Sequence, residues 1–548
     1  MLKRTVLLLF LAPVLMIPTA DAAQEKAFKN LRQIATDAGF YNYRSVTARR
    51  TLKVAILDNG FKGYEEQIGK TLPSDTQYHA GPVSVDAKTE ESHGLAMAQI
   101  VSGLLTEAAP RLTYELHLFS AFGFSNLKSA VETVARDKFD VVLYSQVWEY
   151  GGNGDGRGFV NHVVNQAAQS GALWINAAGN VGNGTYRGKI EKGTDDWAKL
   201  PGANNGVAVR CQKNSKNKCM VRVVLSWNDF SDDSETGTDK DLDLVLTDDA
   251  SKIVGTSALT QMKQIPEGTA GASLYPREII QTEVKPGLYY VRAKIRSSNF
   301  DKKHDELRVT VSGDFVQLQN ASKGETLLSP ADNENVITVG ASDSEKSSFS
   351  KLYSKPELLV PSEIIVSEDE TFKGSSNSAA ITAAGVTLLK AVQPNLTRTR
   401  VLALLGANGG AMPLGEGAGL PLELLGFGPT SRNCFKLTTL PFYPRALQEL
   451  IDTETFIVET THGPKIFTTD DPFELLGRDR VDQDDMLIVR PEGFDQLPRS
   501  SQPFLPQGVF EVVQQPAGQT ICSRGTNRGP IDGVYASHLR MPRPTDVR

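Results

Sequence analysis

The sequence predicts an α/β fold with a mostly parallel sheet, an inserted β-sandwich and a C-terminal β-rich region. Apolar strand-like runs alternate with helical patterns over residues 51–207, which is typical of a parallel sheet covered by helices on both faces. Residues 208–320 hold only short β-like runs separated by Gly, Pro, Asp and Asn, which favours a β-sandwich. The strand–helix alternation returns over residues 321–430, so the sandwich is expected to interrupt one α/β domain.

The expected elements follow from the length and period of each apolar run. An N-terminal helical segment, residues 23–50, should contain a helix at 24–39. The first α/β part should contain strands at 52–58, 140–147 and 172–179 and helices at 94–105 and 159–171. The second part should contain a strand at 335–342 and helices at 381–393 and 399–408. The sandwich strands are expected at 219–227, 241–248, 277–284, 287–296 and 306–313. Residues 431–548, whose role the sequence does not reveal, should contain a hairpin at 455–469 and strands at 485–490 and 508–515.

Residues 1–22 have the pattern of a secretory signal peptide. Lys3 and Arg4 precede an apolar run at 6–17, and Ala20-Asp21-Ala22 matches a small-x-small cleavage site. An uncleaved membrane anchor is the alternative, but the run is shorter than the roughly 20 apolar residues that cross a bilayer. We therefore expect a secreted protein, extracellular or periplasmic, with no transmembrane segment after cleavage.

The charge balance excludes one large class of partners. The formal net charge is −6 over 548 residues, and no clustered basic excess of the kind that binds nucleic acid is present. We expect a monomer that does not bind nucleic acid.

The cysteines should be oxidised, because an exported protein meets conditions in which disulfides persist. Cys211 and Cys219 flank a Lys-rich loop between two strand-like runs, so they can meet across a hairpin. Cys434 and Cys522 then pair by elimination. Free buried thiols are the alternative, and zinc is disfavoured because the sequence has no C-x-x-C pair.

Four short motifs carry the candidate chemistry, although each has an ordinary structural explanation. Asp58 ends an expected strand in a turn-like Asp-Asn-Gly, and His93 opens an expected helix as a lone histidine. Asn180 follows a strand in a Gly-Asn turn, and Ser376 stands where serine commonly caps a helix. Together they supply a nucleophile, a base, a group that orients the base and an oxyanion donor, which acyl transfer requires. All four lie at strand ends or helix starts, where open α/β sheets bind ligands.

The chain order Asp, His, Ser and the surrounding residues resemble the subtilase family of serine peptidases. The similar segments are Leu57-Asp58-Asn59-Gly60, Ser92-His93-Gly94, Asn176-Ala177-Ala178-Gly179-Asn180, Gly374-Ser375-Ser376-Asn377-Ser378-Ala379 and the strand and loop at 335–350. The resemblance covers roughly 51–207 and 321–430. It implies a subtilisin-like three-layer fold and a secreted serine endopeptidase that hydrolyses polypeptides through an acyl-enzyme intermediate.

The resemblance also implies the role of each residue. Ser376 would be the nucleophile, His93 the base, Asp58 the group that orients His93, and Asn180 an oxyanion donor. Ser145, Gln146 and Val147 would pair with the substrate backbone as an added strand.

Three alternatives to an active serine peptidase remain. A catalytically impaired, subtilase-fold binding protein is compatible with Leu95 and Ala380, where the family usually has Thr and Pro. An esterase or lipase is disfavoured because the Ser376 motif lacks the second Gly of G-x-S-x-G. A metallopeptidase is disfavoured because H-E-x-x-H is absent.

We expect the chemistry to require no cofactor. An acidic run in the sandwich is suited to a structural calcium ion, because calcium prefers oxygen ligands. A solvated acidic loop is the alternative. The run consists of Asp229, Asp232, Asp233, Asp239, Asp241 and Asp243.

Overall fold

The structure is a computed structural model that describes residues 27–86, 90–322, 324–353 and 355–407. It also describes the backbone of short strands between residues 433 and 523. The predicted signal peptide therefore lies outside the described residues.

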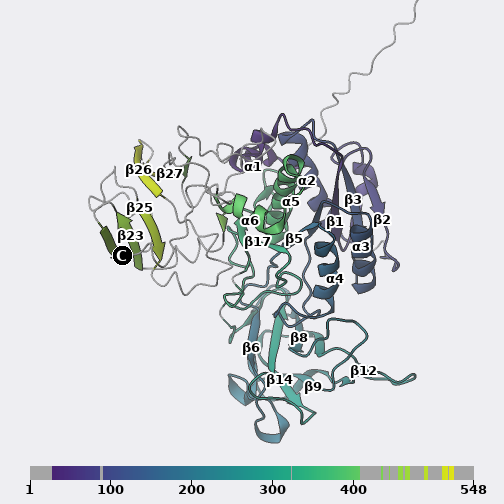
Figure 1. The fold of residues 1–548 in the computed structure, drawn as a ribbon. Coiled ribbons are helices and arrows are strands. Elements are labelled where there is room, and N and C mark those ends of the chain that lie inside the picture. Colours follow the sequence, from purple (N-terminus) through teal and green to yellow (C-terminus); the bar gives the residue numbers. More distant parts are fainter. Residues whose placement is uncertain are drawn as a thin grey trace, which may run out of the picture.

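A sheet of eight strands forms the centre of the α/β part, and it is parallel except for its last strand (Figure 1). The strand order is β2 (Gln77–His79), β3 (Tyr114–Ser120), β1 (Leu52–Asp58), β4 (Val141–Tyr144), β5 (Leu173–Ala177), β17 (Ile337–Ala341), β18 (Leu358–Val360) and the antiparallel β22 (Tyr443–Pro444). Strand β1 pairs with β3 on one side and β4 on the other, so the chain reverses its direction of winding there. A reversal of this kind opens a crevice at the carboxyl ends of the strands.

Helices cover both faces of this sheet (Figure 1). One face carries α1 (Leu31–Asp37), α2 (His93–Ala108), α5 (Ser375–Val392) and α6 (Arg398–Ala407). The other face carries α3 (Phe124–Arg136) and α4 (Phe159–Gln169). Val54 and Ile56 of β1 join the first core, whereas Ala55 and Leu57 join the second, as strand alternation requires. The predicted fold class is therefore confirmed.

Strands β2, β3, β18 and β22 of the sheet were not predicted, nor was the helix α3 that follows β3. The signal for the helix is present in the sequence, because Leu127, Val131 and Val134 recur at helical spacing and are fully buried. Helix α1 is shorter than the expected 24–39, since it spans Leu31–Asp37 and is followed by a short 3₁₀ turn at Phe40–Tyr43.

The inserted region forms two antiparallel sheets that enclose their own apolar core (Figure 1). One sheet contains β10 (Ile253–Ser257), β9 (Leu242–Asp248), β14 (Gly287–Ile295), β7 (Val207–Cys211) and β16 (Val316–Leu318). The other contains β13 (Arg277–Val284), β8 (Cys219–Trp227), β15 (Glu306–Ser312) and β6 (Thr185–Lys189). All five predicted sandwich strands are present. Strand β6 precedes the predicted start at residue 208, yet it pairs with β15 along its whole length.

Short strands complete the described part of the chain. Strands β11 (Thr260–Gln261) and β12 (Ala272–Ser273) pair with each other, as do β19 (Ile364–Ile365) and β20 (Thr371–Phe372). The C-terminal sheet has the order β21 (Asn433–Phe435), β27 (Gly518–Ser523), β26 (Val509–Gln515), β25 (Leu487–Pro491), β23 (Thr455–Thr460) and β24 (Gly463–Thr468). The predicted hairpin is β23–β24. Within the part of the chain that the structure describes, no helix is long and apolar enough to cross a membrane.

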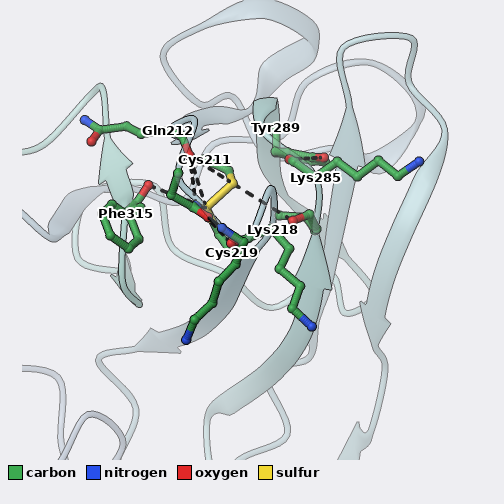
Figure 2. The surroundings of a disulfide bond; sticks show 10 residues. Cys211, Gln212, Lys218, Cys219, Lys285, Tyr289 and Phe315 are labelled. Atoms are coloured by element: carbon green, nitrogen blue, oxygen red, sulfur yellow. Dashed lines mark hydrogen bonds between the residues drawn. A yellow bond between two sulfur atoms is a disulfide. The ribbon is translucent and has the colours of Figure 1, made fainter.

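The predicted Cys211–Cys219 disulfide is confirmed (Figure 2). It joins the end of β7 to the start of β8 with a Cα–Cα distance of 5.9 Å, and both half-cystines are buried. The bridge lies beside the backbone of Gln212 and Phe315 (Figure 2). In the C-terminal sheet, the register places Cys434 directly opposite Cys522. Their predicted bridge involves side chains outside the described residues.

Candidate active site

The structure brings Asp58 and His93 into direct contact. Asp58 ends β1 and its side chain is fully buried, whereas the His93 side chain at the start of α2 is 34% exposed. The His93 Nδ1–H donates to Asp58 Oδ2 at 2.9 Å and Oδ1 at 3.1 Å. The same Oδ1 accepts the backbone N–H of Asn59 at 2.8 Å. A carboxylate held in this way fixes the imidazole tautomer, leaving Nε2 able to accept a proton.

Gly94 allows this contact, because helix α2 begins directly against the end of β1. A Cβ at Gly94 would lie 2.6 Å from the Cβ of Asp58 and 2.7 Å from the carbonyl oxygen of Gly60. The Gly94 N–H donates to that same carbonyl at 2.9 Å. A side chain at Gly94 would therefore push His93 away from Asp58.

The environment of His93 makes it a stronger base than usual. Burial lowers its pKa, but the hydrogen bond and the negative charge of Asp58 raise it by more, and Glu91 adds to the increase. The net result is a His93 pKa above its ordinary value of 6.5. An imidazole with this pKa can take a proton from a hydroxyl group near neutral pH.

Ser376 is the most accessible of the three serines in its motif. Its side chain is only partly buried, and its hydroxyl donates to the Ser145 carbonyl at 3.3 Å. Ser375 and Ser378 are fully buried. The Ser375 Oγ accepts the Gly179 N–H at 3.0 Å, and the Ser378 Oγ donates to the Val360 carbonyl at 2.7 Å. Of the three, only Ser376 is not fully buried.

No hydrogen bond joins His93 to Ser376 in the described part of the chain, although His93 opens α2 and Ser376 lies in the first turn of α5. Helices α2 and α5 pack in the same core. Catalytic hydrogen bonds are often long in a ligand-free enzyme and shorten when substrate binds.

Asn180 lies beside the start of α5 with its side chain exposed. Its Oδ1 accepts the backbone N–H of Ser375 at 3.0 Å, which turns its amide group toward the first turn of the helix. Gly374 leaves room for this amide, because a Cβ there would lie 2.9 Å from Asn180 Nδ2. Nδ2 itself makes no hydrogen bond with the described residues, so it is available as a donor.

The three predicted substrate-binding residues follow β4 directly. Ser145 is buried and contributes its carbonyl oxygen to the contact with Ser376. The Val147 side chain packs with Ala178, Leu327 and Ala331 in a small apolar cluster. The Gln146 side chain reaches the Asp58–His93 pair, a contact about which the sequence made no prediction. Pairing of the 145–147 backbone with substrate stays a prediction.

The sandwich reaches the loop that follows this segment. Glu149 accepts a charged hydrogen bond from Arg222 Nε at 2.7 Å, and it also accepts the Ser312 hydroxyl at 3.2 Å. The Arg277 guanidinium lies 4.2 Å from the centre of the Tyr150 ring. Farther along, the buried Asn153 accepts the Ser226 hydroxyl at 2.8 Å. Sequence analysis did not anticipate these contacts, which join residues far apart in the chain.

The aspartates of the acidic run in the sandwich bind different partners and do not converge on one point. Asp229 binds Lys240 and Thr238, and Asp239 binds Lys263 at 2.8 Å. Asp232 and Asp233 accept backbone N–H groups, and Asp243 pairs with Arg296. Asp241 lies near Asp243 with one oxygen unpaired, and burial followed by the Asp243 charge raises the pKa of Asp241 to about 6. No group of three or more metal-ligating side chains occurs among the residues described, and structural calcium stays a prediction.

Comparison with known proteins identifies one family. Residues 282–420 match the model of the subtilase family, a stretch that includes Ser376 but begins after Asp58, His93 and Asn180. No curated protein sequence matches the chain. The match confirms the resemblance to subtilisin-like peptidases that the motifs predicted.

Several solved structures of proteases are distantly similar. The CspB protease of Clostridium perfringens has 13% identity and a TM-score of 0.42, with 71% of this chain and 94% of that chain covered. MycP1 without its N-terminal propeptide has 15% identity and a TM-score of 0.28, with 71% and 92% covered. The subtilisin-like protease Apa1 from Pseudoalteromonas sp. AS-11 has 10% identity and a TM-score of 0.24, with 68% and 88% covered.

Proposed function

We propose that this subtilase-like chain is a serine endopeptidase that cleaves polypeptides with Asp58, His93 and Ser376. The observation that carries the proposal is the buried Asp58 carboxylate bound to the Nδ1 of a partly exposed His93. That pair lies at the carboxyl end of the sheet, and an accessible serine begins a helix packed in the same core. The family match over the Ser376 region supports the same activity.

The reaction would follow the two steps of acyl transfer. His93 Nε2 takes the Ser376 proton as the oxygen attacks the scissile carbonyl, and it then delivers that proton to the leaving amine. The resulting acyl-enzyme is hydrolysed by water, with His93 again acting as base. Asp58 stabilises the imidazolium in both steps. The Asn180 amide and the Ser376 backbone N–H donate to the oxyanion.

Substrate would bind as an added strand along residues 145–147, beside the apolar cluster of Val147, Ala178, Leu327 and Ala331. The proposed chemistry requires no metal ion or cofactor.

We also propose that the protein is secreted as a monomer after loss of residues 1–22, with the sandwich at 208–320 as an inserted module and a separate β-rich region at 431–548. The pattern of residues 1–22 and the Cys211–Cys219 disulfide support export. N-terminal sequencing of the exported protein tests the cleavage site.

The test of activity is cleavage-site profiling of the mature protein on a peptide library beside its Ser376→Ala variant. We expect internal cleavages that disappear in the variant. Cleavage by both proteins would assign the activity to another residue. No cleavage by either would favour an impaired binding protein with this fold.

A further inference from the structure

The Gln146 side chain makes a contact with the Asp58–His93 pair that the proposed mechanism has not used. Its Nε2–H donates to Asp58 Oδ1 at 2.9 Å, and the same nitrogen lies 3.4 Å from His93 Nδ1. Asp58 Oδ1 thereby accepts three donors, from Gln146, His93 and the Asn59 backbone. Among the described residues, Asp58 Oδ2 accepts a hydrogen bond from His93 alone, at 2.9 Å.

The fold holds Gln146 in this position. It follows β4 directly, and β4 lies beside β1, so the strand pairing brings Gln146 next to the end of β1. The Gln146 carbonyl oxygen accepts the Asn176 side-chain amide at 3.3 Å, and Asn176 is fixed in turn by the Trp174 indole at 3.0 Å. Asn176 and Trp174 belong to β5, so β4 and β5 together constrain the backbone of this glutamine.

We propose that Gln146 is a positioning residue that fixes the rotation of the Asp58 carboxylate and moderates the basicity of His93. This inference rests on the proposed function of the same site. The amide nitrogen Nε2 of Gln146 is a hydrogen-bond donor only. Because Gln146 and His93 both donate to Asp58 Oδ1, the negative charge on this oxygen is shared between the two donors. A hydrogen bond to a carboxylate is charge-assisted and directional, so it resists rotation of the carboxylate away from the imidazole. An aliphatic side chain at position 146 would do neither.

If Gln146 had a merely structural role, its substitution would affect stability and the His93 titration differently. If the amide only fills space beside Asp58, replacing it with a side chain of similar length would change stability without changing how His93 titrates. If it shares the carboxylate charge, removing the donor leaves more of that charge facing His93. The imidazolium is then stabilised and the His93 pKa rises.

The test uses the Gln146→Met and Gln146→Glu variants of the full chain, with Gln99→Leu as the matched control. Gln99 lies on α2 and donates a similar amide hydrogen bond, to Thr71 at 2.9 Å, away from the candidate site. The rate of labelling by a small fluorophosphonate is measured from pH 5 to 9, and the His93 titration is followed by NMR of ¹⁵N-labelled histidine.

For Gln146→Met we expect labelling at pH 7 to fall roughly tenfold, the cost of losing about one charge-assisted hydrogen bond. The midpoint of the acid limb of the labelling rate against pH should rise by about half a pH unit or more. The His93 pKa measured by NMR should rise with it. Gln146→Glu places a second negative charge beside His93, so it should raise the acid-limb midpoint and the His93 pKa further. Gln99→Leu should match the wild type.

Two results separate this inference from the proposed function. A wild-type protein that does not label with fluorophosphonate contradicts the proposed function, while the NMR titration still reports on Gln146. A wild-type protein that labels, with the acid limb of the pH–rate profile and the His93 titration unchanged in Gln146→Met, overturns the inference alone. If Gln146→Met does not fold, Gln146→Leu, which also lacks the amide donor, decides by the same two measurements.

Discussion

The parallel sheet and the β-sandwich place their polar side chains in different ways. At the carboxyl edge of the sheet, His93 and Ser376 are partly exposed and Asn180 is exposed. In the sandwich, many charged side chains pair with one another, as in the Arg187–Glu306 and Lys240–Asp305 pairs at 2.7 and 2.8 Å. The candidate reacting groups are therefore found at the sheet, whereas these ion pairs join neighbouring segments of the sandwich.

The two regions meet at the loop after residues 145–147. Arg222 and Arg277 of the sandwich contact Glu149 and Tyr150 of that loop. Since the loop continues directly from the proposed substrate strand, the sandwich can brace the site without contributing a reacting atom. This division of roles gives four predictions of decreasing size.

The largest effect is expected for Asp58→Asn. An amide at this position can donate to His93 Nδ1 and so favours the wrong tautomer, which costs about 10⁴-fold in kcat in a triad of this type. The measurement is kcat on a cleaved library peptide. A loss of less than about tenfold would mean that the Asp58–His93 contact is structural.

Asn180→Ala should lower kcat by about 10²–10³-fold with a much smaller change in KM, because an oxyanion donor acts mainly in the transition state. Steady-state kinetics separates the two constants. If KM rises while kcat stays constant, Asn180 binds substrate in its ground state and is not an oxyanion donor.

A smaller effect is expected where the sandwich meets the loop. Arg222→Gln and Glu149→Gln should each raise KM for long peptides a few-fold, with a coupling free energy of about 1 kcal/mol or less for a partly exposed pair. Labelling by a small fluorophosphonate should stay within about twofold of wild type, because such a probe does not use the substrate strand. A large loss of labelling would show that the sandwich belongs to the reacting site.

The smallest effect on activity is expected for the double substitution Cys211→Ser and Cys219→Ser. Removing a bridge that closes such a short loop should lower the free energy of unfolding of the sandwich by about 2–3 kcal/mol. Labelling of Ser376 should be unchanged at a temperature where the protein remains folded. Denaturant unfolding followed by Trp fluorescence measures the first effect, and a parallel loss of labelling would contradict the separation of roles.

Local sequence patterns were sufficient for much of this fold. Long apolar runs such as Leu52–Asp58 and Cys219–Trp227 identify strands because burial on both faces demands them. The Cys211–Cys219 pair could be predicted because its partners lie close together in sequence. Strand β6, Thr185–Lys189, could not, because it is short and polar and is stabilised by pairing with β15.

In the candidate site too, residues in local motifs could be predicted, whereas contacts between distant segments could not. Asp58, His93 and Ser376 stand in recognisable local motifs, so sequence was enough to nominate them. The Gln146 side chain could not be assigned to the Asp58–His93 pair, because its direction depends on the register between β4 and β1. The loop contacts of Arg222 and Arg277 likewise depend on how two distant regions pack.

The central claim is that Ser376 is a nucleophile activated by the Asp58–His93 pair. Its most direct test is fluorophosphonate labelling of the mature protein, of Ser376→Ala and of Ser378→Ala, with the labelled residue identified by mass spectrometry. We predict that the wild type is labelled on Ser376, that Ser376→Ala is not labelled, and that folded Ser378→Ala is labelled. Labelling of Ser376→Ala, or no labelling of a folded wild type, would contradict the claim.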